Sequence, residues 1–456
     1  MDKTTEFLAE YATRLRFDQL PAEVVHDTKR KLIDTLGCAI GAFDEAPCRI
    51  ARALARRSVG NPPARVFGTQ EMSTPEHAAF ANGVMVRVQD YNDSYLARAS
   101  CHPSDTIPGL LALADALQRD GESVITATVL AYEVACNFAD VLLREQGFDN
   151  TFFGVMGTAV AGAKLLGLTA EQTQHAISIA ITPNITLAQT RLGELSMWKG
   201  CAAANGVRNG VFAAVAAQHG LTGPDQPIEG RWGLKNVLGD FQWAPFGGRG
   251  GPFRITKTHL KYFPAVVHAQ SPVSAALELH GKVDVHDIEA ITVDTYWVAK
   301  RYSDPNRAEP LWHPRTRETA DHSIPYLVAA ALLDGDVTEA SFTPERIADA
   351  RLGDLMRRIV MREKPEFTAA YPDGWPCRIE LSMKNGEHQV ADVKFFKGHA
   401  MKPLTDAEVE TKFRALTQGL LDETRAAALL DKLWHLEDVA NVRTVLELLE
   451  VKTREH

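Results

Sequence analysis

Apolar residues recur at helical spacing through roughly the first 265 residues of the chain. Residues 109–121, 124–143, 154–168 and 198–220 each carry apolar side chains three and four positions apart. Thr74 followed by Pro75 is typical of a helix start, and Ser123 is expected to cap the helix that follows it. Glycine and alanine are frequent in 154–168 and 198–220, which indicates helices that pack closely. The pattern therefore predicts a large all-helical region.

The pattern changes after about residue 270. Residues 288–298, 358–363, 377–386 and 389–398 alternate well enough to predict strands, and Asn385-Gly386 predicts a hairpin between the last two. Helical spacing returns within 323–335 and 342–358, and again from about residue 405. We therefore expect a mainly α protein. A discontinuous all-helical domain comprises residues 1–268 and 403–456, and an α+β domain comprises residues 269–402.

Composition narrows the class of protein. The 456 residues, of which 45% are hydrophobic and 23% charged, predict a globular chain of two domains. The net charge of −9 disfavours nucleic acid as a partner but leaves room for a small anionic substrate held by a few basic groups. We predict no membrane-spanning segment and no signal peptide, so the cytoplasm is the expected location.

The six cysteines are scattered and include no C-x-x-C pair. That spacing predicts free thiols and neither a zinc ribbon nor a cysteine-rich iron–sulfur site. A cofactor of that kind is therefore not expected.

The densest polar cluster spans residues 89–95 and 101–105, between two apolar helices. It gathers carboxylates, an amide, a hydroxyl and an imidazole, namely Asp90, Asn92, Asp93, Ser94 and His102. Such groups at a helix junction suit acid–base chemistry on an anion. The alternative is an ordinary capped loop, because Asp, Asn and Ser are common turn residues.

Two basic segments are the next candidates. Lys199 lies at the start of a tightly packed helix, where the helix end and partial burial lower a lysine pKa. Lys261 and His268 lie in residues 257–272, at the expected junction of the two domains. The alternatives are a solvated lysine and a linker with incidental charge.

Two smaller features follow. Residues 319–323, which include Asp321 and His322 just before an apolar helix, are a further candidate for the site. The alternative is that Thr319 or Asp321 simply caps that helix. Residues 397–399, Lys-Gly-His, end the last strand, where an ordinary turn is the alternative.

Five segments in one order resemble the MmgE/PrpD family. They are D-Y-N-D-S-Y-L-A with H-P-S-D within 90–105, W-K-G-C-A-A-A-N around Lys199, K-Y-F-P-A-V-V-H-A-Q at 261–270, T-A-D-H-S-I-P-Y at 319–326, and K-G-H at 397–399. The resemblance runs from about residue 5 to residue 430. Asn92 and the Asp105 that follows H-P-S make the first segment most similar to the 2-methylcitrate dehydratase branch.

The resemblance implies a large helical domain with a smaller α+β lid and a homodimer. It implies a cofactor-free, metal-free lyase that eliminates water from 2-methylcitrate or a similar small polycarboxylate. Other members are a cis-aconitate decarboxylase and an iminodisuccinate epimerase. The decarboxylase branch carries His in a G-F-H-P-T segment, whereas this chain has Gly147-Phe148-Asp149-Asn150-Thr151.

Dehydration needs a proton to leave a carbon beside a carboxylate and a hydroxyl to leave the next carbon. The hypothesis assigns proton transfer to His102 with Asp90, while Lys199 and Lys261 hold carboxylates and either lysine donates a proton. The remaining candidates, Asn92, Asp93, Ser94 and His268, position the substrate. An epimerase or decarboxylase of the same family, a metal hydrolase and a non-catalytic helical scaffold are the alternatives.

Overall fold

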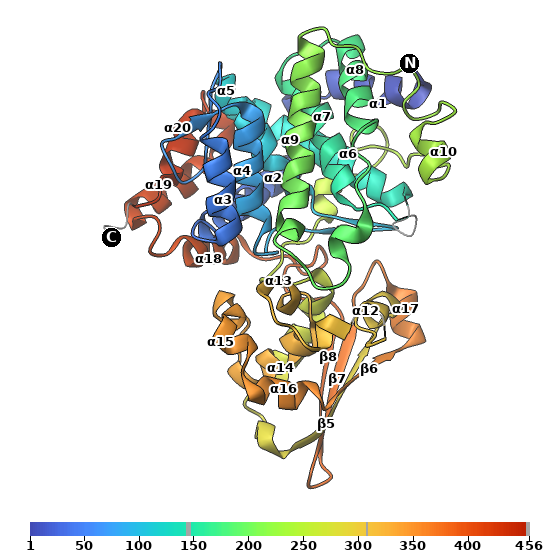
Figure 1. Cartoon of the computed structure of the whole chain (residues 1–456), viewed down its shortest axis with the longest axis vertical. Helices are drawn as coiled ribbons and strands as arrows, with labels where there is room; N and C mark the ends of the chain where they lie inside the picture. Colours follow the sequence, from blue (N-terminus) through green and yellow to red (C-terminus); the bar gives the residue numbers. More distant parts are fainter. Residues whose placement is uncertain (143–146, 307–308, 453–456) are drawn as a thin grey trace.

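The structure is a computed structural model that describes residues 1–142, 147–306 and 309–452. It divides into a helical lobe and a second lobe that contains the main sheet, as Figure 1 shows. The second lobe is built from the middle of the C-terminal half, and the last helices of the chain return to the helical lobe. The mainly α fold class is therefore confirmed. The domain limits 1–268, 269–402 and 403–456 stay a prediction.

The helical lobe is built from long helices and two short strand pairs. Its longer helices are α1 (Lys3–Arg14), α2 (Ala22–Gly41), α3 (Ala46–Ala55), α4 (Pro75–Arg87), α5 (Ile107–Ala116), α6 (Gly121–Val141), α7 (Thr151–Leu165), α8 (Ala170–Ile181), α9 (Trp198–Gln218), α18 (Asp406–Thr417) and α19 (Glu423–Trp434). Its short helices are α10 (Leu234–Leu238) and α20 (Arg443–Leu446), and its strands are β1 (Ala64–Arg65), β2 (Met72–Ser73), β3 (Tyr95–Leu96) and β4 (Ser100–Cys101).

The second lobe has a four-stranded sheet in the order β6-β5-β7-β8. β5 runs parallel to β6 and antiparallel to β7, and β7 pairs antiparallel with β8 through the expected hairpin at Gly386. Its strands are β5 (Ile288–Thr295), β6 (Ile359–Glu363), β7 (Cys377–Met383) and β8 (His388–Val393), and its helices are α11 (Gln270–Leu279), α12 (Trp297–Tyr302), α13 (Arg317–Ala320), α14 (Ile324–Asp334), α15 (Pro344–Ile347), α16 (Ala350–Met356) and α17 (Pro365–Ala370).

Two separate buried clusters of apolar side chains correspond to the two lobes. One runs from Leu8 to Leu260 and resumes at Leu404, and the other contains Phe263 to Phe396. The chain passes between them twice, and the backbone N–H of Leu260 donates to the carbonyl of Gly398 at 3.0 Å where the two passages meet. Alternate residues of β7 are buried, because α11 packs against β7 and β8.

Local sequence signals explain several helix starts, but the cap predicted for α6 is wrong. Thr74 accepts from the N–H of His77 at the start of α4, as expected. Ser123 does not cap α6, since Asp120 does so and the helix begins three residues earlier. Among the described residues, α6 is the one helix that is long and apolar enough to cross a membrane by length and composition alone. Of its most apolar window, 89% is buried in the fold, which is how the core helix of a globular protein behaves.

Close packing of α9 on α7 gives a testable prediction. A Cβ on Gly210 would lie 2.7 Å from the carbonyl oxygen of Val155 and 2.8 Å from Cβ of Thr158. Gly210→Ala should therefore lower the free energy of unfolding by about 1–3 kcal/mol. Gly154→Ala is the matched control, because the nearest atom to its Cβ would be 3.7 Å away and alanine favours helix by about 1 kcal/mol. Urea denaturation measures both, and equal stability of the two variants would contradict the packing argument.

Candidate active site

Asp90 lies at the centre of a buried ionic cluster between the lobes. It follows α4 and adopts φ +51°, a left-handed conformation that Asp tolerates better than most residues. The ammonium of Lys261 donates to the Asp90 carbonyl at 2.7 Å and to its carboxylate Oδ1 at 2.9 Å. One lysine thus binds both the main chain and the side chain of Asp90, which fixes where the carboxylate points.

Lys199 approaches the same carboxylate from another direction. It is the second residue of α9, and its Nζ lies 3.8 Å from Asp90 Oδ2 and 3.3 Å from Asp321 Oδ2. Lys199 and Lys261 have no solvent-exposed surface, and Asp90 is 1% exposed. Small residues around Lys199 let α9 come close to α4, where Cβ of Gly200 would lie 3.1 Å from Cα of Val88.

Arg87, in the last turn of α4, connects Asp90 to His102. Its guanidinium donates to Asp90 Oδ1 and, at 3.0 Å, to His102 Nε2. His102 Nδ1 lies 2.6 Å from the carbonyl oxygen of Asp93, so Nδ1 carries the proton and Nε2 accepts from Arg87. Both nitrogens of His102 are therefore engaged in the described conformation.

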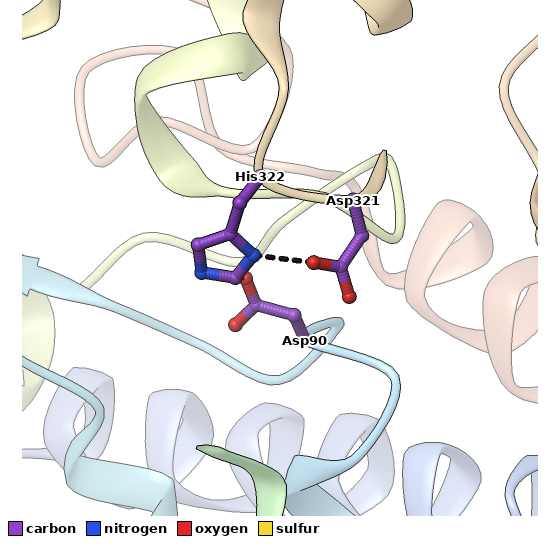
Figure 2. Close-up of side chains that lie close together, drawn as sticks. All are labelled: Asp90, Asp321 and His322. Carbon is purple, nitrogen blue, oxygen red and sulfur yellow. Dashed lines mark hydrogen bonds and ion pairs between the residues drawn. The ribbon is translucent and has the colours of Figure 1, made fainter. Parts of the chain in front are cut away.

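The second lobe supplies three more groups, all from the segment that contains α13 and the start of α14. Arg317 donates to Asp321 Oδ2 at 3.2 Å, and Asp321 Oδ1 bonds His322 Nδ1. His322 Nε2 faces Asp90 Oδ2 at 3.5 Å. Figure 2 shows Asp321 and His322 converging with Asp90 from the opposite lobe. The cap of α14 is Ser323, so neither Thr319 nor Asp321 has that role.

The environment shifts the pKa of each group. Burial alone would raise the pKa of Asp90, but Arg87 and the two lysines outweigh burial and hold it well below its usual range. Burial lowers the pKa of Lys261 to about 8 against the opposing pull of Asp90, and it lowers the pKa of Lys199 as well. Burial and Arg87 lower the pKa of His102 well below its ordinary value. The imidazole of His102 is therefore neutral at pH 7.

Three cations, Arg87, Lys199 and Lys261, converge on the single carboxylate of Asp90. Arg87 also faces Asp105 at 3.9 Å, Lys199 also pairs with Asp321, and Arg317 pairs with Asp321 and Glu339. Ligand atoms of Asp90, Asp321 and His322 lie within 4.8 Å of one another, a spacing that suits a divalent ion. Lys199 contacts both carboxylates, so its charge would oppose such an ion. The arrangement suits an anion better.

The polar residues after Asp90 hold their loop together. Asn92 donates to Ser104 Oγ at 2.9 Å and to Asp105 Oδ1 at 2.8 Å. Asp93 accepts from the backbone N–H of Ser104 at 3.0 Å and from the Tyr132 hydroxyl at 2.8 Å. These bonds are the ones that the ordinary-loop alternative requires. Burial raises the pKa of Asp105 to about 6.

Ser94 and His268 are at the edge of the cluster. The backbone of Ser94 exchanges two hydrogen bonds with that of His259, 2.9 and 2.8 Å long, which aligns the segment that carries Lys261. His268 is partly buried, and its Nδ1 lies 2.6 Å from the Tyr296 hydroxyl. Its ring is 6.0 Å from Tyr302, whose ring is 6.3 Å from His322, so His268 lies behind the second-lobe side of the cluster.

The structure thus brings Asp90, His102, Lys199 and Lys261 into one network, as the sequence-based hypothesis requires. Sequence reasoning missed Arg87 and Arg317 and left Asp321 and His322 unassigned. An arginine near the end of an otherwise apolar helix was a usable signal for Arg87, because a buried cation needs a partner. Nothing local distinguishes Arg317 from a surface arginine.

Comparisons with known proteins agree on one family. Residues 6–244 match the MmgE/PrpD N-terminal domain, and residues 263–436 match the MmgE/PrpD C-terminal domain. A 2-methylcitrate dehydratase of Cupriavidus necator is 32% identical over 82% of this chain and 80% of its own length. A 2-methylcitrate dehydratase of Salmonella typhimurium is 31% identical over 78% of this chain and 77% of its own length.

A relative with a different activity is also similar. The cis-aconitate decarboxylase of Homo sapiens is 26% identical over 98% of this chain and 94% of its own length. The two domain matches together cover most of the chain. Asp90, His102 and Lys199 lie inside the first match, Asp321 and His322 lie inside the second, and Lys261 lies in the short stretch between the two. The chain belongs to the MmgE/PrpD family.

Proposed function

We propose that this protein is a hydro-lyase that removes water from 2-methylcitrate or a closely related small polycarboxylate. The observation that carries the proposal is the convergence of three buried cations, Arg87, Lys199 and Lys261, on the one carboxylate of Asp90, because the carboxylates of a substrate could pair with them. The names of the similar dehydratases support the reaction type.

The chemistry requires stabilisation of negative charge and a proton donor. Removal of a proton beside a carboxylate places enolate charge on that carboxylate, which Lys199 and Arg87 would stabilise as fixed cations. Lys261, with a pKa of about 8, is protonated at neutral pH and can release its proton to a departing hydroxyl. Side chains of this chain thus supply both needs.

His102 gains a free nitrogen if Arg87 turns from it to a substrate carboxylate. In the described conformation Arg87 occupies Nε2 of His102. A substrate carboxylate is a stronger acceptor for a guanidinium than a neutral imidazole is. Substrate binding would therefore expose the Nε2 of a neutral imidazole, which could accept a hydrogen bond from the substrate.

The second lobe would act as a lid. Lys199, Lys261 and Asp321 have no exposed surface, so a substrate reaches them only if the lobes separate. The contacts that must part include Lys199 with Asp321 at 3.3 Å, Arg317 with the carbonyl of Val88 at 3.0 Å, and His322 with Asp90 at 3.5 Å. Closure over the substrate would then exclude water from the reacting groups. A homodimer in the cytoplasm is the expected setting and stays a prediction.

Decarboxylation of cis-aconitate is the second candidate, because the human decarboxylase is similar along nearly the whole chain. The segment that carries His in the decarboxylase branch has Asp149 here. Asp149 is buried and accepts from Arg191 Nε at 2.7 Å, so it supplies a carboxylate already paired with a guanidinium. A paired carboxylate does not replace an imidazole as a proton donor, which favours dehydration.

Product analysis tests the reaction. The purified protein is incubated separately with 2-methylcitrate, citrate, cis-aconitate and iminodisuccinate. It should form an unsaturated product from one of the first two acids, which ultraviolet absorbance and mass spectrometry detect. Carbon dioxide release from cis-aconitate without alkene formation from the others would replace dehydration with decarboxylation. No change in any of the four acids would contradict an enzyme of this class.

Single substitutions test the cluster. Lys199→Ala and His102→Ala should each lower turnover by about 10²–10³, because a fixed electrostatic or acid–base group is lost from a buried site. Lys432→Ala is the matched control, since Lys432 contacts Thr444 in another helix pair, away from the cluster. Circular dichroism checks folding, and near-normal turnover in a folded variant would reject the role of that residue.

The rate should fall in alkaline solution. Lys261 is charged below a pKa of about 8 and neutral above it, so kcat/KM should decrease as pH rises from 7 to 10. Lys261→Arg keeps a charge across this range. Its kcat/KM should be lower at pH 7 but show no decrease near pH 8. If kcat/KM of Lys261→Arg decreased near pH 8 as it does in the wild type, a group other than Lys261 would be responsible for the decrease.

A further inference from the structure

His322 is a second imidazole in the cluster, and its position differs from that of His102. It lies between α13 and α14 and is 6% exposed. Its Nδ1 bonds Asp321, while Nε2 points toward Asp90 with no donor facing it among the described residues (Figure 2). His322 therefore has one nitrogen anchored and one directed into the space between the lobes.

The bonding pattern fixes which nitrogen can take up a proton. Asp321 is ionised, because Lys199, His322 and Arg317 outweigh its burial and lower its pKa, so Nδ1 of His322 donates the hydrogen. Burial, with Lys199, lowers the pKa of His322 to about 4, which keeps the ring neutral and leaves a lone pair on Nε2. A carboxylate on Nδ1 orients an imidazole as a base, which is the arrangement of hydrolase triads.

Asp90 would stabilise the proton after transfer. A hydrogen on His322 Nε2 would point at Asp90 Oδ2, now 3.5 Å away, and an imidazolium would then lie between two carboxylates. His102 has no comparable support, because its Nδ1 faces a neutral carbonyl and its Nε2 faces a guanidinium. Of the two rings, His322 is the better placed to accept a proton from carbon.

We propose that His322 is the base that removes the proton from the carbon next to a substrate carboxylate, and that Asp321 positions it. The proposal rests on the hydro-lyase function above. The C–H bond breaks, its electron pair enters the carboxylate as enolate, and the proton forms an N–H bond at Nε2. The neighbouring C–O bond then breaks as the carbon–carbon double bond forms, and the hydroxyl leaves as water with a proton from Lys261. When the lobes separate, His322 returns its proton to solvent and Lys261 takes one up.

The proposal makes catalysis depend on closure. Asp90 and Lys199 belong to the helical lobe, whereas Asp321 and His322 belong to the second lobe. The base therefore reaches the substrate only when the lobes meet. The substrate carboxylates that enter beside His322 would also raise its pKa above the value of the empty site and make it a stronger base.

Substitution of His322 by the two amides is the direct test. His322→Asn keeps a donor near Nδ1, and His322→Gln places an amide near Nε2, so both preserve polarity while removing the proton acceptor. Each should lower kcat by about 10²–10⁴ with KM changed less than about threefold. His280→Gln is the control, because His280 is an exposed second-lobe histidine away from the cluster, whose Nδ1 lies 2.9 Å from the carbonyl oxygen of Leu332. It should keep the wild-type kcat.

Chemical rescue separates a base from a structural role. Imidazole added to His322→Ala should restore part of kcat, and the gain should follow the concentration of neutral imidazole as pH is varied. Asp321→Asn should lower kcat without raising KM, since it removes the group that orients the ring but no substrate contact. A folded His322→Gln with kcat within about threefold of wild type would overturn the proposal, as would His322→Ala that imidazole does not restore.

Deuterium uptake distinguishes failure of this proposal from failure of the proposed function. In heavy water the wild type should incorporate deuterium into recovered substrate at the carbon that loses its proton, and His322→Gln should not. A wild type that neither dehydrates nor exchanges any acid of the panel would sink the hydro-lyase function and this inference with it. A wild type that dehydrates while His322→Gln dehydrates and exchanges equally would sink the assignment of His322 alone.

Discussion

The contact between Lys261 and Asp90 is the interaction on which the site depends. One ammonium binds the carbonyl and the carboxylate of a residue held in a left-handed conformation, with neither side chain exposed to solvent. That contact joins the segment leaving α4 to the segment where the chain first crosses between the lobes. Arg87, Lys199 and His322 then take their positions around the carboxylate whose direction it fixes.

Burial of so many charges is a poor way to stabilise a fold. Each ion loses hydration worth several kcal/mol, which attraction between partners only partly returns, and apolar residues of similar size often do as well or better. Three cations also share the one carboxylate of Asp90. The carboxylates of a bound ligand would give them further partners. The cost of the cluster is therefore better explained by binding and catalysis than by stability.

Local pattern was enough to predict most of the fold. The small-residue helices, the four strands of the second lobe and the Asn385-Gly386 hairpin all depend on periodicity or on turn chemistry that acts within a few residues. The start of α6 was misplaced because Asp120 and Ser123 are equally acceptable caps in sequence. In the structure Asp120 caps the helix, and the N–H of Gly121 donates to the carbonyl of Val439, a contact with a distant segment that the local sequence does not show.

The site was predicted less completely, because its residues lie far apart in the sequence. Asp90, His102, Lys199 and Lys261 carried signals in polar clusters and basic segments. Apart from the pair of Arg87 and Asp90, however, the side-chain partners of these four residues in the cluster lie 15 to 232 positions away. Asp321 looked like a helix cap because the same residue type serves both purposes. In the structure Ser323 caps α14, so the Asp321 carboxylate can bond Lys199 and His322 instead.

Desolvation, a single physical cause, gives two groups of the cluster opposite roles. It lowers the pKa of Lys261 from 10.5 to about 8, which turns a strongly basic amine into an acid able to release its proton near neutral pH. It lowers the pKa of His322 from 6.5 to about 4, which keeps that ring neutral and ready to accept. A bound polycarboxylate would raise both values. In the proposed reaction the acid would then stay charged until the hydroxyl leaves, and the base would strengthen as the substrate arrives. The substrate itself would then bring the proton donor and the proton acceptor into balance.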